Sequence, residues 1–174
     1  MIINFVTSNP GKVKEFKQIL EPKIKVNHIK ISYPELRSDN PEEIARASAE
    51  MLANKLKKTV VVEDSGLFIN ALYDFPGTCS AYIHKRIGLK GIIKLMEGIK
   101  DRRCAYKSAV SYCEPGKKPI SFLGEEKGNA AEKIKGSRKI DLSYLQLPML
   151  MKFMGGGNGG ARGNFNFGPQ ISIL

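Results

Sequence analysis

The 174-residue sequence predicts an α/β fold, because buried-type strands alternate with amphipathic helices along its first half. Three observations carry this prediction. Ile2 to Val6 reads as a short apolar strand that leads through a polar turn into a helix. A second helix begins with an Asn-Pro pair at Asn40, and Val60 to Val62 form a continuous β-branched run of the kind that a parallel strand shows when both its faces are covered.

The first strand is followed by a turn at Thr7 to Asn9 and by Pro10, a residue favoured at the first position of a helix. Free backbone N–H groups, the positive end of the helix dipole and Lys12 would together favour a phosphate group. The alternative is a capped amphipathic helix with a lysine in solvent. The segment lacks the GxxxxGK[ST] pattern, which argues against a P-loop nucleotide fold. The helix carries apolar residues at helical spacing: Val13, Phe16, Ile19 and Leu20.

The next elements are a strand within Lys23 to Ile31 and a helix that we expect from Pro41 to about Lys58, capped by Asn40. Between them Glu35 follows a proline and is a candidate second metal ligand, although an isolated acid in such a place is more often a plain surface residue. The predicted buried stripe of the helix consists of Ile44, Ala47, Met51, Leu52 and Leu56.

The segment Val60 to Tyr82 is the most informative part of the chain. Its valine run leads directly into Glu63 to Gly66, and ligands in open α/β sheets gather beyond the carboxyl ends of such strands. A metal ion or a water molecule would find oxygen ligands there. The alternative is an acidic turn in which Asp64 caps the next element. Phe75 to Thr78 forms a second tight turn, so we expect the chain to double back near the carboxylates.

Further along, Arg86 to Glu97 has the pattern of an amphipathic helix. Cys104 to Cys113 and Ile120 to Leu123 flank Glu114-Pro115-Gly116, which predicts a β-hairpin. Phe122 to Ile134 reads as a further strand pair near the site.

Composition excludes several classes of protein. No apolar run approaches the roughly 20 residues that a membrane span requires, and the first residues lack the pattern of a signal peptide, so we expect a cytoplasmic protein. Cys79, Cys104 and Cys113 are odd in number and lack metal-type pairing, which argues against a disulfide scaffold or a zinc site. His28 and His84 lie outside any nucleophile or metal motif, and catalysis is therefore left to carboxylates and lysines.

The formal net charge of +11 fits either a nucleic-acid surface or a polyanionic small ligand with a lysine-rich exterior. Basic residues are spread along the chain without an aromatic-interleaved patch or a recognition-module motif. We therefore do not expect nucleic acid to be the main partner.

Four segments together resemble the inosine triphosphatase family, and its archaeal members most: TSNPGKVKEF at Thr7 to Phe16, YPE at Tyr33 to Glu35, EDSGLFINAL at Glu63 to Leu72 and FPGTCSAY at Phe75 to Tyr82. The resemblance covers about Met1 to Arg138. It implies a two-lobed mixed β-sheet flanked by helices and a homodimer in which the hairpin often forms the dimer side. It also implies hydrolysis of ITP, dITP or XTP to the monophosphate and pyrophosphate, a house-cleaning reaction of the nucleotide pool.

The resemblance implies a role for each matched residue. Glu35 and Asp64 would share a Mg²⁺ ion, Asp64 would also be the general base, and Ser65 would contact the substrate. Magnesium prefers oxygen ligands and neutralises phosphate charge, which suits a site of this composition. The loop that would hold the triphosphate consists of Thr7, Ser8, Asn9, Pro10, Gly11 and Lys12.

The segment Lys139 to Leu174 departs from the family pattern. A GFGYDPIF-like segment and a later Ser-His-Arg are absent, and half of the residues from Gly155 to Gly168 are glycine. We expect a nucleotide pyrophosphatase-like domain at 1–138 and an atypical, disordered or poorly packed tail at 139–174. The explanations are divergence or a changed reading frame; our hypothesis is the latter, and an uninterrupted frame on resequencing would refute it. Because the base-recognition motifs lie in this part, the alternative function is an inactive nucleotide- or RNA-binding remnant.

Overall fold

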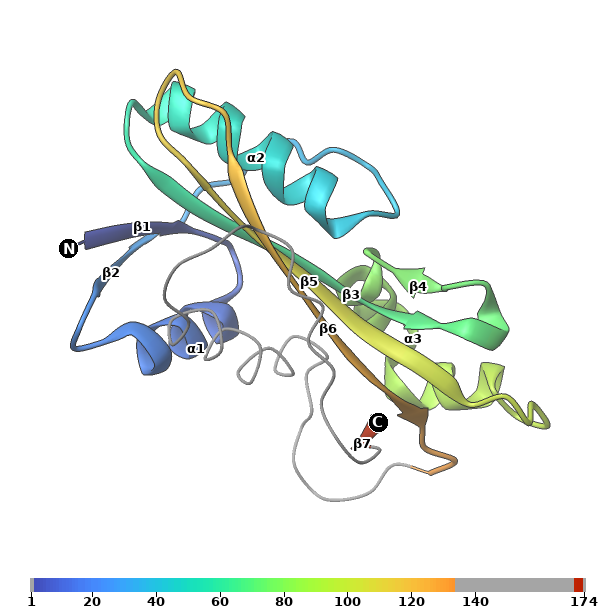
Figure 1. Cartoon of the computed structure of the whole chain (residues 1–174). Helices are drawn as coiled ribbons and strands as arrows, with labels where there is room; N and C mark the ends of the chain where they lie inside the picture. The colour runs from blue at the N-terminus through green and yellow to red at the C-terminus, as the bar shows by residue number, and fades with distance from the viewer. Residues whose placement is uncertain (1, 134–170, 174) are drawn as a thin grey trace.

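A computed structural model describes residues 2–133 and 171–173 of the chain, and it has the predicted α/β fold (Figure 1). One mixed sheet runs through the described residues in the order β2-β1-β3-β5-β6-β7, and β4 pairs with β3 beside this path. The elements are β1 Ile2–Val6, α1 Pro10–Leu20, β2 Lys25–Ile29, α2 Pro41–Leu56, β3 Val60–Ile69, a 3-10 turn at Asn70–Leu72, β4 Pro76–Gly77, α3 Ser80–Leu95, β5 Arg103–Cys113, β6 Ile120–Ala130 and β7 Ile171–Ile173.

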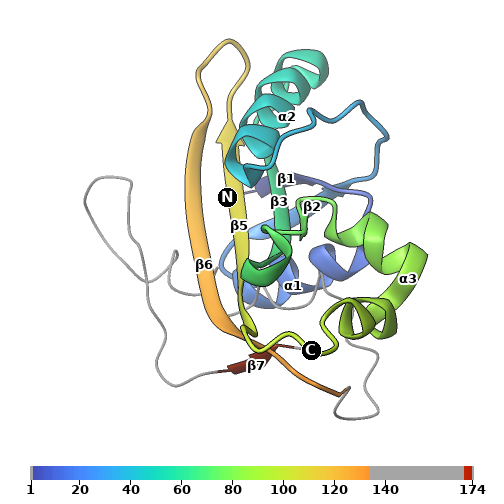
Figure 2. The same ribbon diagram turned by 90° about the vertical axis from the view of Figure 1, so that its right-hand side faces the viewer.

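The sheet has a parallel part and an antiparallel part, which gives the molecule two lobes. Strands β2, β1 and β3 are parallel, whereas the long strands β3, β5 and β6 are antiparallel to one another. The long strands extend from a lobe that holds β1, β2, α1 and α2 to a lobe that holds β4 and α3 (Figures 1 and 2). The two-lobed mixed sheet implied by the sequence is thus confirmed.

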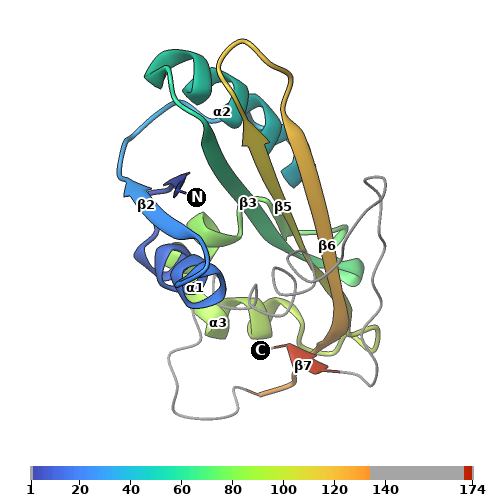
Figure 3. The same cartoon turned by 60° about the vertical axis from the view of Figure 1, so that its left-hand side comes forward.

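The valine run of β3 is buried on both faces, as predicted. Val60 and Val62 pack in one cluster with Leu52 of α2, whereas Val61 packs in another cluster with Phe16 of α1. The two helices therefore cover opposite faces of the parallel part of the sheet, and Figure 3 shows them on either side of it. Burial on both sides explains why this strand reads as a continuous apolar run instead of an alternating one.

The predicted end of this strand was wrong. Strand β3 continues through the acidic residues 63–66 to Ile69, because β5 pairs with it over its whole length from Val60 to Ile69. The parallel partner β1, in contrast, pairs only as far as Val62. The acids thus lie at the carboxyl end of β1 but in the middle of β3, and the alternative in which Asp64 caps a following turn is also wrong.

Helix α2 begins at Pro41 as predicted, but its buried face differs in part from the predicted stripe. Ala47 is not buried, whereas Ala45, Ala49 and Ala53 are buried together with Ile44 and Leu52. Alanines four residues apart lie on one face of a helix, and their small side chains allow a close approach to the sheet.

Three elements have different bounds from those predicted. Helix α3 begins at Ser80 instead of Arg86 and is interrupted at Gly88, where φ is 62°. Strand β6 runs unbroken from Ile120 to Ala130, because it pairs with β5 over this length, and the separate strand pair expected after Phe122 is not formed within residues 122–130. The β-hairpin and the doubling back of the chain at β4 are confirmed.

Most of the predicted tail, residues 139–170 and 174, lies outside the described residues, as does the predicted boundary at residue 138. Ile171–Ile173 form β7, which pairs in parallel with the end of β6, so these three residues differ from the disorder expected for the tail. The three cysteines are free thiols; Cys104 and Cys113 are buried, whereas Cys79 is exposed. No helix in residues 2–133 or 171–173 is long and apolar enough to cross a membrane.

Candidate active site

The candidate site lies along one edge of β3, at the point where the strand that pairs with this edge changes from β1 to β4. Strand β1 pairs with β3 up to Val62, and β4 pairs with it again from Leu67. Within the described chain, no strand pairs with residues 63–66 on this side, and the loop of residues 7–9 leaves β1 beside the gap. The interruption leaves residues 63–66 without a neighbouring strand on this side, next to the amino end of α1, and Asp64 and Ser65 are half-buried there.

The loop after β1 is held by its own polar side chains. The Asn9 side-chain oxygen accepts hydrogen bonds from the N–H groups of Gly11 at 2.8 Å and Lys12 at 3.4 Å, while Thr7 Oγ1 accepts from the Asn9 N–H at 3.1 Å. Asn9 therefore caps α1. The sequence predicted free N–H groups in the first turn, but the N–H groups of Gly11 and Lys12 are bound to Asn9. The helix dipole and Lys12 remain as attractions for an anion. From the neighbouring strand, His28 Nε2 lies 2.9 Å from the Thr7 carbonyl oxygen.

Lys12 forms a buried ion pair with Glu63, a residue that the sequence placed among the possible oxygen ligands for a metal or a water. Its Nζ lies 2.5 Å from Oε2 of Glu63, and the side chains of Lys12 and Glu63 are only 14% and 1% exposed. Ser108 of β5 donates a hydrogen bond of 2.9 Å to the other carboxylate oxygen of Glu63. Burial alone would lower the pKa of Lys12, but the Glu63 carboxylate outweighs it and the pKa lies above its ordinary value.

Asp64 has the opposite environment. Its Oδ2 atom is buried without a hydrogen-bond partner among the described residues. Burial raises the pKa of Asp64 to about 7; the Lys12 charge opposes this rise, and the Glu63 and Glu35 carboxylates add to it. An unsatisfied buried oxygen with such a pKa is a group that a proton or a metal cation would stabilise.

Glu35 lies in the irregular segment between β2 and α2 and is exposed. Burial raises the pKa of Tyr33, and the charge and hydrogen bond of Glu35 raise it further, so the carboxylate lies beside this phenol. Its charge also reaches Asp64. Thr78, next to β4, ties this segment to the second lobe by donating a hydrogen bond of 2.6 Å to the Ser38 carbonyl.

Asp64 and Glu35 fit the usual way in which proteins bind magnesium better than they fit a metal site formed by protein ligands alone. The described residues contain no group of three or more His, Cys, Asp or Glu side chains able to hold a metal. Magnesium, however, is usually bound through one or two carboxylates together with waters and substrate phosphates. The unsatisfied oxygen of Asp64 and the nearby charge of Glu35 fit that pattern.

Ser65 and Gly66 complete the floor of the site. The Tyr106 hydroxyl of β5 donates a hydrogen bond of 3.1 Å to Ser65 Oγ. Gly66 is required by a close approach, since a Cβ atom there would overlap the Gly77 carbonyl group of β4. Ser80 fixes this contact by donating to the same carbonyl at 2.6 Å and accepting from the Leu67 N–H at 2.7 Å.

The predicted site residues thus lie around one gap in the sheet, together with two polar neighbours that were not predicted. Tyr106 and Ser108 reach the site only because β5 pairs with β3 in this register. A serine and a tyrosine within a predicted strand give no local signal of such a role. In the sequence, the adjacency of Glu63 to Asp64 was the only sign of additional polar residues at the site.

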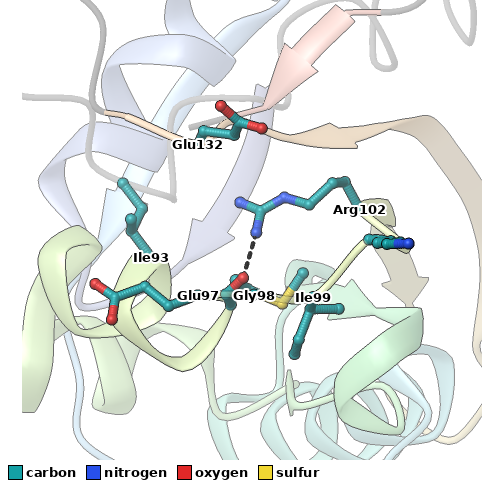
Figure 4. A pocket seen from close by; sticks show the side chains of 8 residues that line it. Ile93, Glu97, Gly98, Ile99, Arg102 and Glu132 are labelled. Carbon is teal, nitrogen blue, oxygen red and sulfur yellow. Dashed lines mark hydrogen bonds between the residues drawn. The ribbon is translucent and has the colours of Figure 1, made fainter.

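The pocket in Figure 4 lies elsewhere, at the end of α3, and includes none of the predicted site residues. Its volume is about 560 Å³, and Arg102 crosses it with hydrogen bonds to three carbonyls, of Met96 at 2.7 Å, Ala130 at 2.9 Å and Ala131 at 2.6 Å. This arginine joins the end of α3 to the end of β6, which is a structural task. The pocket is lined by Ile93, Met96, Glu97, Gly98, Ile99, Lys100, Arg102 and Glu132.

Comparison with known proteins identifies the family. A sequence model of the Ham1 family matches residues 3–146 of the chain. The chain belongs to the Ham1 family. Two similar relatives bear the name dITP/XTP pyrophosphatase. The protein of Methanopyrus kandleri is 46% identical over 149 residues, which cover 85% of this chain and 79% of the relative. That of Thermococcus kodakarensis is 44% identical over 149 residues, covering 85% and 80%.

Solved Ham1 structures share the fold. The Staphylococcus aureus Ham1 protein superposes with a TM-score of 0.68 and 27% sequence identity, over 80% of this chain and 77% of that one. The similarity confirms both the α/β architecture and the resemblance read from the motifs at residues 7–16 and 63–82. The Ham1 match ends at residue 146, beyond Arg138, where the motifs alone ended the resemblance.

Proposed function

We propose that this chain hydrolyses non-standard purine nucleoside triphosphates, namely ITP, dITP and XTP, to the monophosphate and pyrophosphate. The observation that carries the proposal is the gap in the sheet, which brings the unsatisfied carboxylate of Asp64 together with Lys12 at the amino end of α1. The Ham1 relatives named dITP/XTP pyrophosphatase support this choice of reaction and substrate.

Residues 7–12 provide the binding surface for the phosphates. The positive end of the α1 dipole and the Lys12 ammonium attract the triphosphate, and Ser8 offers an exposed hydroxyl in the same loop. A net charge of +11 adds a long-range attraction for an anion of this kind. Ser65 lies on the adjacent strand, where its hydroxyl is held by Tyr106.

Asp64 and Glu35 would hold Mg²⁺, which when bound supplies positive charge to the phosphate oxygens. Asp64 would also accept the proton of the attacking water. A bound cation favours the deprotonated carboxylate that this role requires, although burial raises the pKa of Asp64 in the metal-free site. Water adds across the bond between the α and β phosphates, and Lys12 stabilises the charge left on the departing pyrophosphate.

The test is to incubate the protein with ITP and Mg²⁺ and to measure pyrophosphate and free phosphate separately. We expect pyrophosphate from the wild type and a loss of at least about 1,000-fold in Asp64→Asn, because the base and a metal ligand are removed together. Asp74→Asn, at an exposed acid in the turn before β4, is the matched control and should retain full activity.

Two other outcomes would contradict the proposal. Binding of ITP without release of pyrophosphate would favour the inactive nucleotide-binding remnant, which the Ham1 comparisons do not favour. Release of free phosphate alone would show cleavage of the terminal phosphate instead.

We also propose that the chain forms a homodimer and acts in the cytoplasm, where the nucleotide pool is used. Ile120 and Leu123 of β6 are large apolar residues that are half exposed, which supports an interface along the hairpin. Light scattering in solution measures the mass, and a monomer at micromolar concentration would contradict the dimer. Cell fractionation tests the location.

A further inference from the structure

We propose that Glu63 is a positioning residue, which holds the ammonium group of Lys12 near Asp64, at the gap in the sheet, before the substrate binds. The inference rests on the proposed function, since it assigns Lys12 to the triphosphate. It goes beyond that function because Glu63 itself has no part in the reaction described above.

The burial of this ion pair is the first argument. Glu63 is 1% exposed and its Oε2 lies 2.5 Å from Lys12 Nζ. A carboxylate in such a place carries a large desolvation cost unless a positive charge and hydrogen bonds compensate it. The carboxylate therefore cannot turn to solvent, and Lys12 is its ionic partner in the described part of the chain.

The second argument is that Glu63 is fixed independently of Lys12. Ser108, on the neighbouring strand β5, donates a hydrogen bond of 2.9 Å to Oε1 of Glu63, and both residues are buried. Backbone pairing between β3 and β5 holds the two residues in register, with Ser108 opposite Ser65. The anchor of the lysine is thus built into the middle of the sheet.

The third argument concerns the two faces of β3. Side chains alternate along a strand, so Glu63 points to the face covered by α1, like Val61, whereas Asp64 points to the opposite face, like Val62. Glu63 can therefore hold a residue of α1 without competing with Glu35 for the position of a cation at Asp64. Adjacent acids serve different partners.

The consequence for binding is preorganisation. A free lysine side chain carries considerable rotamer entropy, which it would lose when a phosphate immobilises it. With Glu63 in place, part of this loss occurs during folding, and the phosphate meets an ammonium group that already has a fixed position.

A double-mutant cycle separates this role from mere support of the fold. Glu63→Gln keeps the shape and the Ser108 contact but removes the charge. We expect kcat/KM for ITP with Mg²⁺ to fall about 100-fold, the loss typical of a misplaced binding group, mainly through KM. In a Lys12→Met background the same change should cost less than about threefold, because there is no lysine left to position. High enzyme concentrations keep the slow variants measurable.

Controls make each outcome decisive. Ser111→Ala removes another hydrogen bond of β5, to Ser121, and should leave kcat/KM unchanged.

If Glu63→Gln does not fold, Ser108→Ala takes its place in the cycle with a smaller loss of about fivefold that again depends on Lys12. Equal losses in the wild-type and Lys12→Met backgrounds, or no loss at all, would overturn the inference. If the wild type releases no pyrophosphate, the proposed function fails instead, and the same cycle is then measured in the Kd for ITP by calorimetry.

Discussion

The two long helices of the molecule have the same length but very different surroundings. Helices α2 and α3 each span 16 residues. Seven residues of α2 are buried, whereas only two residues of α3 are buried. Helix α2 packs on a sheet face whose strands carry valines, whereas α3 leaves Tyr82, Ile87 and Leu95 exposed. The comparison teaches that α2 is held mainly by its wide apolar face, whereas α3 combines a smaller apolar contact at Ile92 with specific polar contacts.

Those polar contacts lie at both ends of α3. Ser80 holds the first turn to β3 through Gly77 and Leu67, and Arg102 holds the last turn to the end of β6. The loop of residues 7–12 and the acids Glu63 and Asp64 belong to the lobe of α1 and α2 or to the sheet, whereas Glu35 lies in an irregular segment. Positions on strands and helices suit a preorganised site.

The largest expected effect compares one leucine in each helix. Leu52 of α2 is fully buried, so Leu52→Ala should lower the free energy of unfolding by about 2 to 5 kcal/mol. Leu95 of α3 is 47% exposed, and Leu95→Ala should cost less than about 0.5 kcal/mol. Urea denaturation of both variants measures the difference. Equal losses would show that α3 is packed as tightly as α2.

The next effect concerns the free-energy cost of burying the Asp64 carboxylate in β3 without a hydrogen-bond partner for Oδ2. The folded pKa of Asp64, about 7, lies above its ordinary value of 3.8, so the folded protein loses stability as the pH rises from about 4 to 7. Asp64→Asn should therefore stabilise the metal-free protein by about 2 kcal/mol at pH 8 and leave it unchanged at pH 4. Thermal melts in EDTA across this range test the sign. A destabilised variant at pH 8 would mean that the carboxylate has a partner.

Local signals in the sequence were sufficient for much of the first lobe. Asn9-Pro10 and Asn40-Pro41 set the starts of α1 and α2, because cap and proline chemistry act within a few residues. The valine run set the buried part of β3 for the same reason. The motif residues of the candidate site also came from segments that are continuous in the chain.

The parts that could not be predicted depend on pairing between distant segments. Glu-Asp-Ser-Gly reads as a turn by composition, yet it is strand, since β5 supplies ten consecutive partners from Cys104 to Cys113. The link between Lys12 and Glu63 spans two elements, and only the folded sheet brings Ser108 to the same carboxylate. A strand register is not written in either strand alone.

The smallest expected effect tests the contact between the two lobes at Glu35. Thr78, at the start of the α3 lobe, holds the segment of Glu35 by its hydrogen bond of 2.6 Å to Ser38. Thr78→Val keeps the size of the side chain but removes the donor, which costs about 1 kcal/mol of local order. We expect the Mg²⁺ concentration for half-maximal activity to rise about fivefold with little change in kcat, because the position of Glu35, a proposed metal ligand, is loosened. Thr78→Ser restores the hydroxyl and should restore the wild-type value. A Thr78→Val variant with unchanged magnesium dependence would show that Glu35 is held by its own lobe, through Tyr33, and that the second lobe does not contribute to the metal site.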